Sequence, residues 1–265
     1  MSTQWSLVLF TALTGLAGWM FACIALDEFL GKTKKTAAMA SLVAIIVAVV
    51  GGIASVTHLA HPENIMNVFG HPTEGIFLEA LLVGLMCVFG IIYLILVKRD
   101  ASAGARKAMA VLAAVFGILL SFFAGKSYMM AAIPAWNSIL LPFGYLGTAI
   151  PGGVAAYLLI VGAQKEDAEA VKTYGKVLAI AGLVGAILGI LYFAAAAPAQ
   201  MTMGVIVAIC GIIAAVAGVM AVRQPEKVML WAGLALVCAF VGILCFRVAM
   251  WGAYDRVIDL FGLVY

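Results

Sequence analysis

A histidine stands where one long apolar stretch ends and a polar segment begins. Gly51, Ser55 and His58 recur at intervals of four and three residues, so they share one face of a helix that Pro62 keeps from extending. Small residues with one imidazole at their end form a slot that a flat ring can enter from the bilayer. We therefore take His58, with Ser55 beside it, as candidate binding residues. The alternative is an interfacial histidine that only hydrogen-bonds a loop carbonyl.

An acid follows at the start of the next apolar stretch. Glu79 lies one turn into that stretch, and a polar segment joins the two stretches at one membrane face, so Glu79 and His58 are expected at similar depth. A carboxylate in an apolar setting is suited to accept a proton near neutral pH. We predict that His58 and Glu79 act as the proton acceptors of one site. The alternative is a Glu79 side chain that pairs with Lys126 or Arg247 purely for structure.

Three more polar residues lie near the same membrane face. Arg247, close to the end of the last apolar stretch, is expected to pair with Glu79 or to face lipid headgroups. Lys126 and Tyr128, close to the end of the fourth stretch, either line the same pocket or anchor the chain at the interface. The aromatic residues at this rim are expected to form an interfacial belt; they are Trp5, Phe69, Trp136, Trp251 and Tyr254.

The elements that position these residues follow from composition. Of 265 residues, 66% are hydrophobic and 10% are charged, whereas a soluble domain is about 45–50% apolar and about 25% charged. This excludes a soluble enzyme, a disordered chain and a nucleic-acid-binding protein. An outer-membrane barrel is excluded because its lumen requires alternating polar residues. The composition predicts an all-α, polytopic integral membrane protein.

Eight apolar runs have the length of roughly 20 residues that a spanning helix needs. They cover 5–28, 36–59, 75–97, 108–131, 142–163, 175–197, 201–222 and 228–250. We predict one integral membrane domain over residues 1–265, built as two packed four-helix bundles. The longest pieces between or after these runs leave no room for a soluble catalytic domain.

Basic residues set the predicted orientation. Twelve of the fifteen Lys and Arg residues fall in four alternate segments, which are 29–35, 98–107, 164–176 and 223–227. The positive-inside rule places these segments in the cytoplasm and both termini outside, as in a multi-pass protein of the bacterial cytoplasmic membrane. At the inner surface, Asp27 and Glu28 are expected to be solvated and to pair with Lys32.

Redox ligands are not expected in this chain. The five cysteines all fall in predicted spans without a C-x-x-C pair, which favours small buried apolar side chains over a metal or iron–sulfur site. Membrane haem usually needs two histidines that face each other from different helices, and here only His58 lies in a span. We therefore expect no haem, no iron–sulfur cluster and no metal ion.

Together these features resemble the membrane anchor subunit of the dimethyl sulfoxide reductase family, DmsC. The resemblance covers nearly the whole chain. It rests on eight spans and on Ser55-x-x-His58-Leu59-x-x-Pro62, the early acid Glu79, Pro134-x-Trp136-x-Ser138, Pro142-x-Gly144, and Arg247 followed by Trp251-Gly252.

The resemblance implies an anchor that oxidises menaquinol near the outer face and has no cofactor of its own. Electrons would pass to a four-cluster iron–sulfur subunit and then to a molybdopterin catalytic subunit, both docked at the outer face. His58 matches the family's quinol-site histidine, and Glu79 matches its early acid. The predicted quinol pocket comprises His58, Glu79, Arg247, Lys126, Tyr128 and Ser55.

Two other functions stay open from the residues alone. The first is a small-solute or ion transporter, although transporters commonly carry polar residues at the midplane, and here the ionisable residues gather near one surface. The second is a haem-bearing or purely structural anchor. The terminal electron acceptor is set by another subunit, and the sequence leaves the quinone type and the direction of electron flow open.

Overall fold

The computed structural model describes residues 3–57, 70, 74–254, 259–260 and 263–264. Within them, eight helices are long and apolar enough to cross a membrane, which confirms the predicted all-α polytopic class. The helices are α1 (Trp5–Leu30), α2 (Thr36–Val56), α3 (Gly75–Lys98), α4 (Ala103–Lys126), α5 (Leu140–Ala163), α6 (Ala168–Ala196), α7 (Met201–Arg223) and α8 (Val228–Gly252). The short helices η2 (Pro198–Gln200) and η3 (Pro225–Lys227) precede α7 and α8, and β1 (Asp259–Leu260) pairs antiparallel with β2 (Leu263–Val264).

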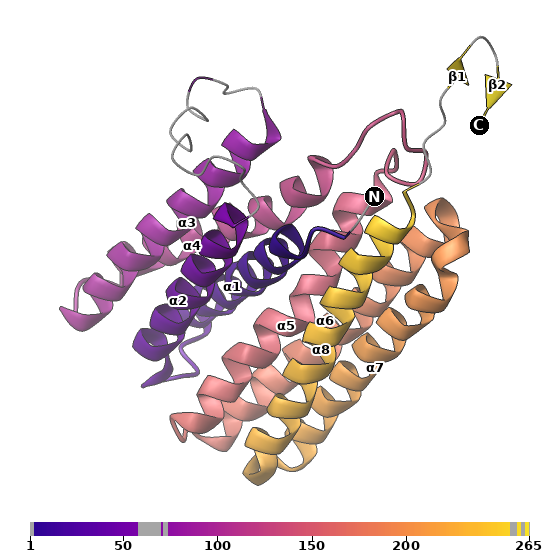
Figure 1. Ribbon diagram of the computed structural model, residues 1–265. Coiled ribbons are helices and arrows are strands. Elements are labelled where there is room, and N and C mark those ends of the chain that lie inside the picture. The colour runs from indigo at the N-terminus through magenta and orange to yellow at the C-terminus, as the bar shows by residue number, and fades with distance from the viewer. Residues whose placement is uncertain (1–2, 58–69, 71–73, 255–258, 261–262, 265) are drawn as a thin grey trace.

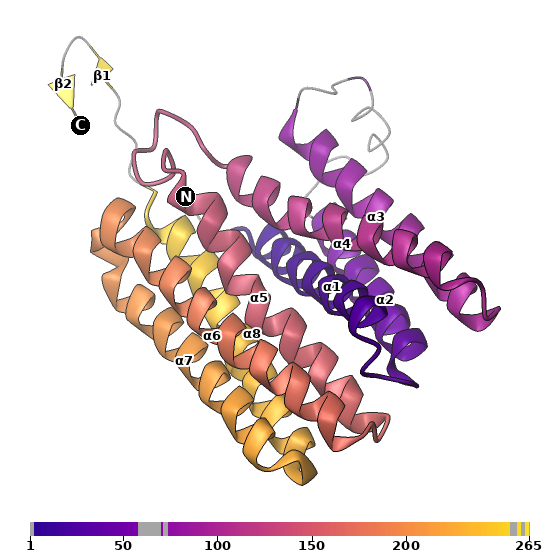
Figure 2. The same cartoon turned by 180° about the vertical axis from the view of Figure 1, so that it is seen from behind.

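The helices form two groups of four. Helices α1–α4 pack together and α5–α8 pack together, as Figure 1 and the reverse view in Figure 2 show. Helices α1 and α4 of the first bundle meet α5 of the second along the boundary between them. We call the end that carries residues 127–139 the outer end, following the orientation predicted from the basic residues, and the opposite end the inner end.

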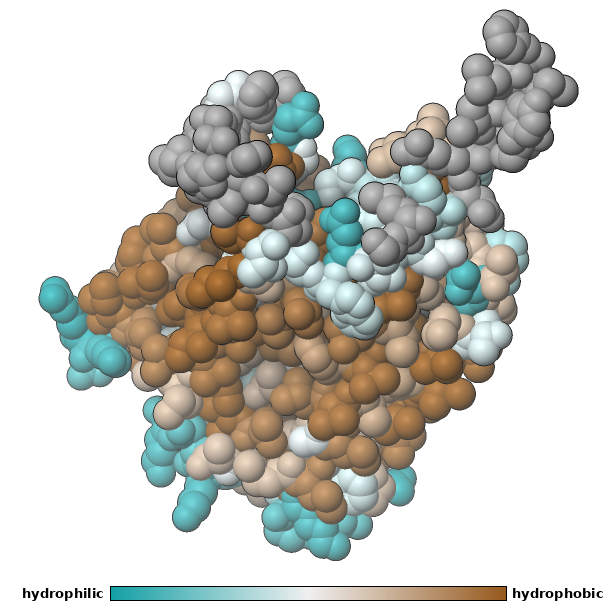
Figure 3. Space-filling view, in the orientation of Figure 1, coloured by the Kyte–Doolittle hydropathy of each residue, from teal (hydrophilic) through white to brown (hydrophobic). Residues whose placement is uncertain are grey.

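An apolar belt surrounds both bundles. Figure 3 shows hydrophobic residues between hydrophilic groups that gather at the two ends. Large apolar side chains point away from the protein along this belt; Ile180 is 65% exposed and Val237 is 64% exposed. Such a surface is stable against lipid tails and would aggregate in water. The chain is therefore a multi-pass membrane protein.

Helices α4 and α6 begin more than one turn before their predicted apolar runs. Helix α4 begins at Ala103 because the Ser102 hydroxyl accepts a hydrogen bond from the Ala105 amide at 3.4 Å. Helix α6 begins at Ala168 because the Asp167 carboxylate accepts one from the Ala170 amide at 2.9 Å. Helix α4 ends at Lys126, five residues before the predicted end at residue 131. Residues 127–139 therefore lie outside the helices and contribute to the outer end.

The first bundle is held together by close backbone contact. A Cβ atom added to Gly18 of α1 would lie 2.7 Å from the backbone of Gly117 in α4, and one added to Gly117 would lie 2.4 Å from the Gly18 Cα atom. Small residues allow transmembrane helices to approach this closely, and the approach replaces the hydrophobic driving force that lipid removes. Helix α1 is thereby fixed at the centre of the molecule.

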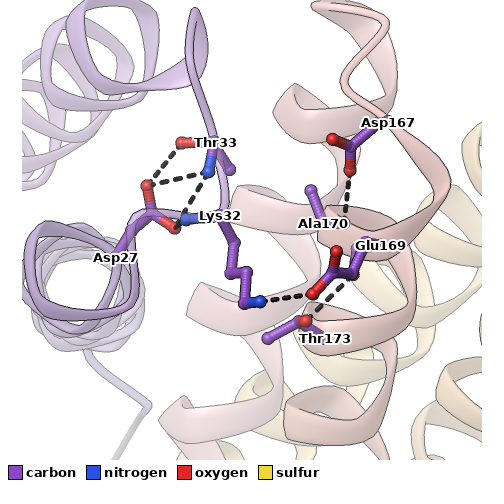
Figure 4. Close-up of polar contacts among 7 residues, drawn as sticks. All are labelled: Asp27, Lys32, Thr33, Asp167, Glu169, Ala170 and Thr173. Carbon is purple, nitrogen blue, oxygen red and sulfur yellow. Dashed lines mark hydrogen bonds and ion pairs between the residues drawn. The ribbon is translucent and has the colours of Figure 1, made fainter.

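At the inner end, carboxylates join the two bundles (Figure 4). Asp27 of α1 is buried and accepts hydrogen bonds from the Tyr174 hydroxyl of α6 at 2.7 Å and from the Thr33 hydroxyl at 2.5 Å. Lys32 forms an ion pair with Glu169 of α6 instead of with Asp27. The expectation of a solvated Asp27 paired with the Lys32 side chain is therefore wrong, because backbone and hydroxyl donors satisfy this carboxylate inside the protein.

A second carboxylate completes this inner junction. Oε1 of Glu166, in the link before α6, accepts hydrogen bonds from the amides of Lys34, Lys35 and Thr36 at 2.9, 2.6 and 3.0 Å, and from the Thr36 hydroxyl at 3.0 Å. No side chain of its own segment caps α2, so Glu166 of the other bundle accepts hydrogen bonds from the free amides at the start of α2.

Glu28 was also expected to pair with Lys32. Its carboxylate instead accepts a hydrogen bond from the Tyr93 hydroxyl at 2.8 Å.

Candidate functional site

The described part of the site is built from the outer ends of the helices. His58, with His61 and His71, lies outside the described residues, so its predicted role stays a prediction. Ser55 lies in the last turn of α2, half-buried, and its hydroxyl donates to the Gly52 carbonyl oxygen at 2.9 Å. Serine hydroxyls in helices commonly make this contact with the preceding turn.

Glu79 is held by a neighbouring helix. It lies in the second turn of α3, half-buried, and its Oε1 atom accepts a hydrogen bond from the Ser127 hydroxyl at 2.6 Å. Ser127 directly follows the last residue of α4. The outer ends of α3 and α4 therefore place a carboxylate and a hydroxyl together at the edge of the first bundle.

Tyr128 continues this polar edge toward the second bundle. Its ring centroid lies 5.9 Å from that of Tyr145 in α5 and 5.6 Å from that of Trp251 in α8. Burial raises the pKa of the Tyr128 hydroxyl above its ordinary value, and the negative charge of nearby Glu79 raises it further. Tyr128 therefore keeps its proton at neutral pH and offers a hydrogen-bond donor beside a carboxylate.

Arg247 lies at the outer junction between the bundles. It is 0% exposed and donates to the Thr11 hydroxyl at 2.9 Å, the Thr11 carbonyl at 3.1 Å and the Ile243 carbonyl at 3.3 Å. A longer contact of 3.4 Å reaches the Thr148 hydroxyl, and the guanidinium lies 4.6 Å from the Tyr145 ring centroid. Both expected arrangements are wrong, because Arg247 faces neither headgroups nor Glu79 but neutral acceptors of α1, α5 and its own helix.

Lys126 is separate from this group. Its side chain is exposed at the end of α4, and its ammonium lies 5.8 Å from the Phe123 ring centroid. The contact is a cation over an aromatic face at the membrane edge. Of the predicted pocket residues that the structure describes, Glu79 and Tyr128 lie close together. Tyr128 and Arg247 both lie against the Tyr145 ring, whereas Lys126 lies over the Phe123 ring.

The aromatic residues at the outer end form a packed cluster. Trp136 and Trp251 are only 2% and 4% exposed, their ring centroids lie 5.3 Å apart, and the Trp136 indole donates to the Met250 carbonyl at 2.8 Å. The expectation of an interfacial belt is wrong for these two residues. It fits Trp5, which is 56% exposed. The cluster holds residues 127–139 on the end of α8.

Sequence reasoning missed three residues that complete this arrangement. Ser127, Tyr145 and Thr11 supply the donor to Glu79, the ring beneath Arg247 and its closest acceptor. The first has a signal in the sequence, since Ser127 stands between the two residues already singled out at positions 126 and 128. Thr11 has none, because it lies 236 positions from its partner.

The described residues contain no group of three or more Cys, Asp, Glu or His side chains that could hold a metal ion. All three histidines fall outside that part of the chain. The described part offers the Glu79 carboxylate, the hydroxyl groups of Ser127 and Tyr128, and a buried cation, which can accept a proton and form hydrogen bonds. This set is suited to an apolar ligand that carries a few polar oxygen atoms.

A comparison with known families identifies the family of the chain. The family model described as DMSO reductase anchor subunit (DmsC) matches residues 1–251, nearly the whole chain. A search of curated proteins gives no match. The matched range includes Glu79, Ser127, Tyr128 and Arg247, and it covers all eight helices except Gly252, the last residue of α8. The chain therefore belongs to the family of DMSO reductase anchor subunits.

Proposed function

We propose that this chain anchors a molybdopterin oxidoreductase complex in the bacterial cytoplasmic membrane and oxidises menaquinol as substrate. Electrons pass to an iron–sulfur subunit, which feeds the molybdopterin catalytic subunit, and both partners dock at the outer end. Family membership supports the anchor role. The observation that supports quinol oxidation is the Glu79 carboxylate at the edge of an apolar bundle, with the Ser127 hydroxyl at 2.6 Å and Tyr128 next in the chain.

Quinol oxidation requires proton acceptors next to the ligand. Each quinol releases two electrons and two protons, and its ring otherwise presents only apolar surface. Glu79 accepts one proton and His58 the other, and both protons leave toward the outer side. Tyr128, which keeps its own proton, orients a ligand oxygen by hydrogen bonding. The electrons leave to the partner because this chain is proposed to hold no redox cofactor of its own.

The apolar surroundings determine where the substrate enters. Menaquinol dissolves in the bilayer, and the outer ends of α2 and α3 border the lipid-facing surface, where Ile53 and Ile76 are 61% and 48% exposed. A ligand arriving from the membrane therefore meets Glu79 before it reaches the aromatic cluster. This approach also explains why a carboxylate is tolerated at this depth, since intramembrane ionisable residues are commonly functional.

The test is His58→Ala in native membranes that contain the assembled complex. We expect the rate of quinol-driven reduction of the terminal acceptor to fall at least tenfold, by analogy with the loss of a positioned acid or base (about 10²–10⁴-fold). A soluble reduced dye that donates directly to the catalytic subunit serves as the control, and its rate should not change. An undiminished quinol-driven rate in this variant contradicts the proposed function.

A further inference from the structure

We propose that Ser127 is a positioning residue for Glu79 that keeps the carboxyl group in one orientation in both of its protonation states. This inference rests on the proposed function, in which Glu79 accepts a proton from the substrate. An ionised carboxylate accepts hydrogen bonds, and a protonated carboxyl group can donate one. A neighbour that holds the group in place must therefore donate to the ionised form and accept from the protonated form.

The Ser127 hydroxyl has two possible acceptors within hydrogen-bond distance. Its oxygen lies 2.6 Å from Glu79 Oε1 and 3.0 Å from the carbonyl oxygen of Ala124. A hydroxyl carries one hydrogen and accepts through two lone pairs. While Glu79 is ionised, the hydrogen points to the carboxylate, which is the stronger acceptor.

Protonation of Glu79 reverses this hydrogen bond. The carboxyl O–H then donates to Ser127 Oγ, and the serine hydrogen turns to the Ala124 carbonyl, which stands ready at 3.0 Å. The hydrogen bond between Ser127 and Glu79 Oε1 is therefore kept in both states, and neither state requires Glu79 to move. A residue without this dual capacity would lose the hydrogen bond to Glu79 in one of the two protonation states.

The backbone holds Ser127 in place for this role. Its amide donates to the Phe123 carbonyl at 2.8 Å, which continues the last turn of α4. From the other side, Gly75 at the start of α3 lies so close that an added Cβ atom would be 2.9 Å from the Ser127 Cβ atom. A larger residue at position 75 would separate the two helix ends. The short distance to Glu79 thus follows from the packing of α3 against α4.

Other titratable and charged groups near Glu79 act at longer range. Tyr128 follows Ser127 in the chain, its ring contacts that of Tyr145 in α5, and Arg247 of α8 lies on the Tyr145 ring. Glu74 and Lys126 are exposed at the ends of their helices. The histidines and Glu63 of the α2–α3 segment lie outside the described residues. Among the described residues, Ser127 is the one that donates a hydrogen bond to Glu79.

The experiment compares Ser127→Ala with Ser102→Ala in membranes that hold the assembled complex. Ser102 caps the opposite end of the same helix, so this control removes a serine hydrogen bond without touching Glu79. Quinol-driven reduction of the terminal acceptor is measured across pH. We expect the acid limb of the Ser127→Ala profile to move about one pH unit upward, since loss of a donor disfavours the ionised carboxylate. Ser102→Ala should keep the wild-type profile.

A double-mutant cycle separates positioning from general structure. In a Glu79→Gln background, Ser127→Ala should change neither the rate nor the profile further, because no carboxylate is left to position. If Ser127→Ala fails to assemble, Ser127→Cys replaces it, since a thiol has similar size and is a weaker donor, and the same direction of shift is expected. A wild-type acid limb in the substituted protein, or a shift that persists beside Glu79→Gln, overturns the inference.

Failure of the proposed function gives a different pattern. If Glu79→Gln alone leaves the quinol-driven rate and its pH profile unchanged, Glu79 is not the proton acceptor, and the role of Ser127 falls with it. If Glu79→Gln abolishes the pH dependence while Ser127→Ala has no effect, only the positioning role is overturned. The rate with a soluble reduced dye, measured on every variant, shows that the partner subunits are still attached and active.

Discussion

The two bundles are joined at both ends, and the two junctions are built from opposite charges. At the inner junction, the carboxylates of Asp27 and Glu166 receive hydrogen bonds from hydroxyl groups and from backbone amides. At the outer junction, the guanidinium of Arg247 donates to hydroxyl and carbonyl oxygens of Thr11 and Ile243. At both ends, these charged groups have neutral hydrogen-bond partners, some of which belong to the other bundle.

The surroundings of the two charges differ more than their chemistry. Glu166 is half-buried at a polar end, next to exposed lysines, so water and neighbouring cations screen its negative charge. Arg247 is completely buried within the last helix, and no carboxylate among the described residues forms an ion pair with it. A buried charge of this kind is costly and depends on every hydrogen bond that it makes. The outer junction is therefore the more sensitive of the two.

The largest expected effect follows from removing the buried cation. Arg247→Ala removes the donor to the Thr11 and Thr148 oxygens, although both hydroxyls keep their bonds to carbonyls of their own helices. It also opens a cavity where α1, α5 and α8 meet. We expect the free energy of unfolding to fall by about 3 kcal/mol or more. Thermal unfolding of the purified protein in detergent measures this loss. Arg247→Lys should be intermediate, because an ammonium keeps the charge but not the planar set of five donors.

Arg223→Ala is the matched control, since Arg223 is exposed at the end of α7. It should unfold at the wild-type temperature. If Arg247→Ala were as stable as this control, the contacts to Thr11 and Thr148 would contribute nothing to the outer junction, and the contrast between the two ends would disappear.

The inner junction should respond less strongly, and in a graded way. Glu166→Ala removes an oxygen that accepts four hydrogen bonds, but the freed amides lie near water and can be solvated there. We expect a loss of about 1–2 kcal/mol in the free energy of unfolding. Glu166→Gln keeps an accepting oxygen and should lose less than half as much. Glu226→Ala, an exposed acid at the same end, is the control.

Equal effects of the two Glu166 variants would contradict this account. They would mean that the negative charge, not the accepting oxygen, holds the start of α2. Thermal unfolding at low and high ionic strength gives a second measurement, because a charge effect at a surface weakens with salt and a hydrogen-bond effect does not.

The sequence predicts the helices well, since the membrane sets their length. Apolar runs of about 20 residues are recognisable without any knowledge of packing, and all eight have a counterpart among the helices of the structure. Helix starts such as Ala103 were missed because capping by Ser102 begins the helix within a charged segment. Glu79 was found because an acid inside an apolar run is rare and conspicuous.

The partners of these residues could not be predicted from the sequence. A soluble helix shows its core-facing side as an apolar stripe, whereas a membrane helix is apolar on the lipid side as well. The pattern therefore does not indicate that Phe246 of α8 is buried while Val237 of the same helix is exposed. Nor does spacing along the chain connect Thr36 with Glu166 or Thr11 with Arg247, which are 130 and 236 positions apart.

The smallest expected effect concerns the exposed ion pair of the inner junction. The hydrogen bond that Lys32 donates to Glu169 raises the pKa of Lys32 above its ordinary value of 10.5. The stabilisation is therefore complete below that value and is lost only as the pH rises through the still higher folded-state value. Between about pH 6 and about pH 8 the contribution is therefore constant, and an exposed pair contributes little. Lys32→Ala should shift the unfolding temperature by less than about 1 °C, because exposed pairs are screened and mobile.

Comparison of this variant with Glu166→Ala decides what holds the inner junction. Both residues lie within the same contact between the α1–α2 turn and the start of α6, but only Glu166 engages backbone amides. If Lys32→Ala destabilised the protein as much as Glu166→Ala, attraction between opposite charges would hold the inner junction, unlike the outer junction, where Arg247 has neutral partners. If Lys32→Ala has no effect, the carboxylates act as acceptors for a turn that has no cap of its own, whereas the outer junction depends on one buried cation.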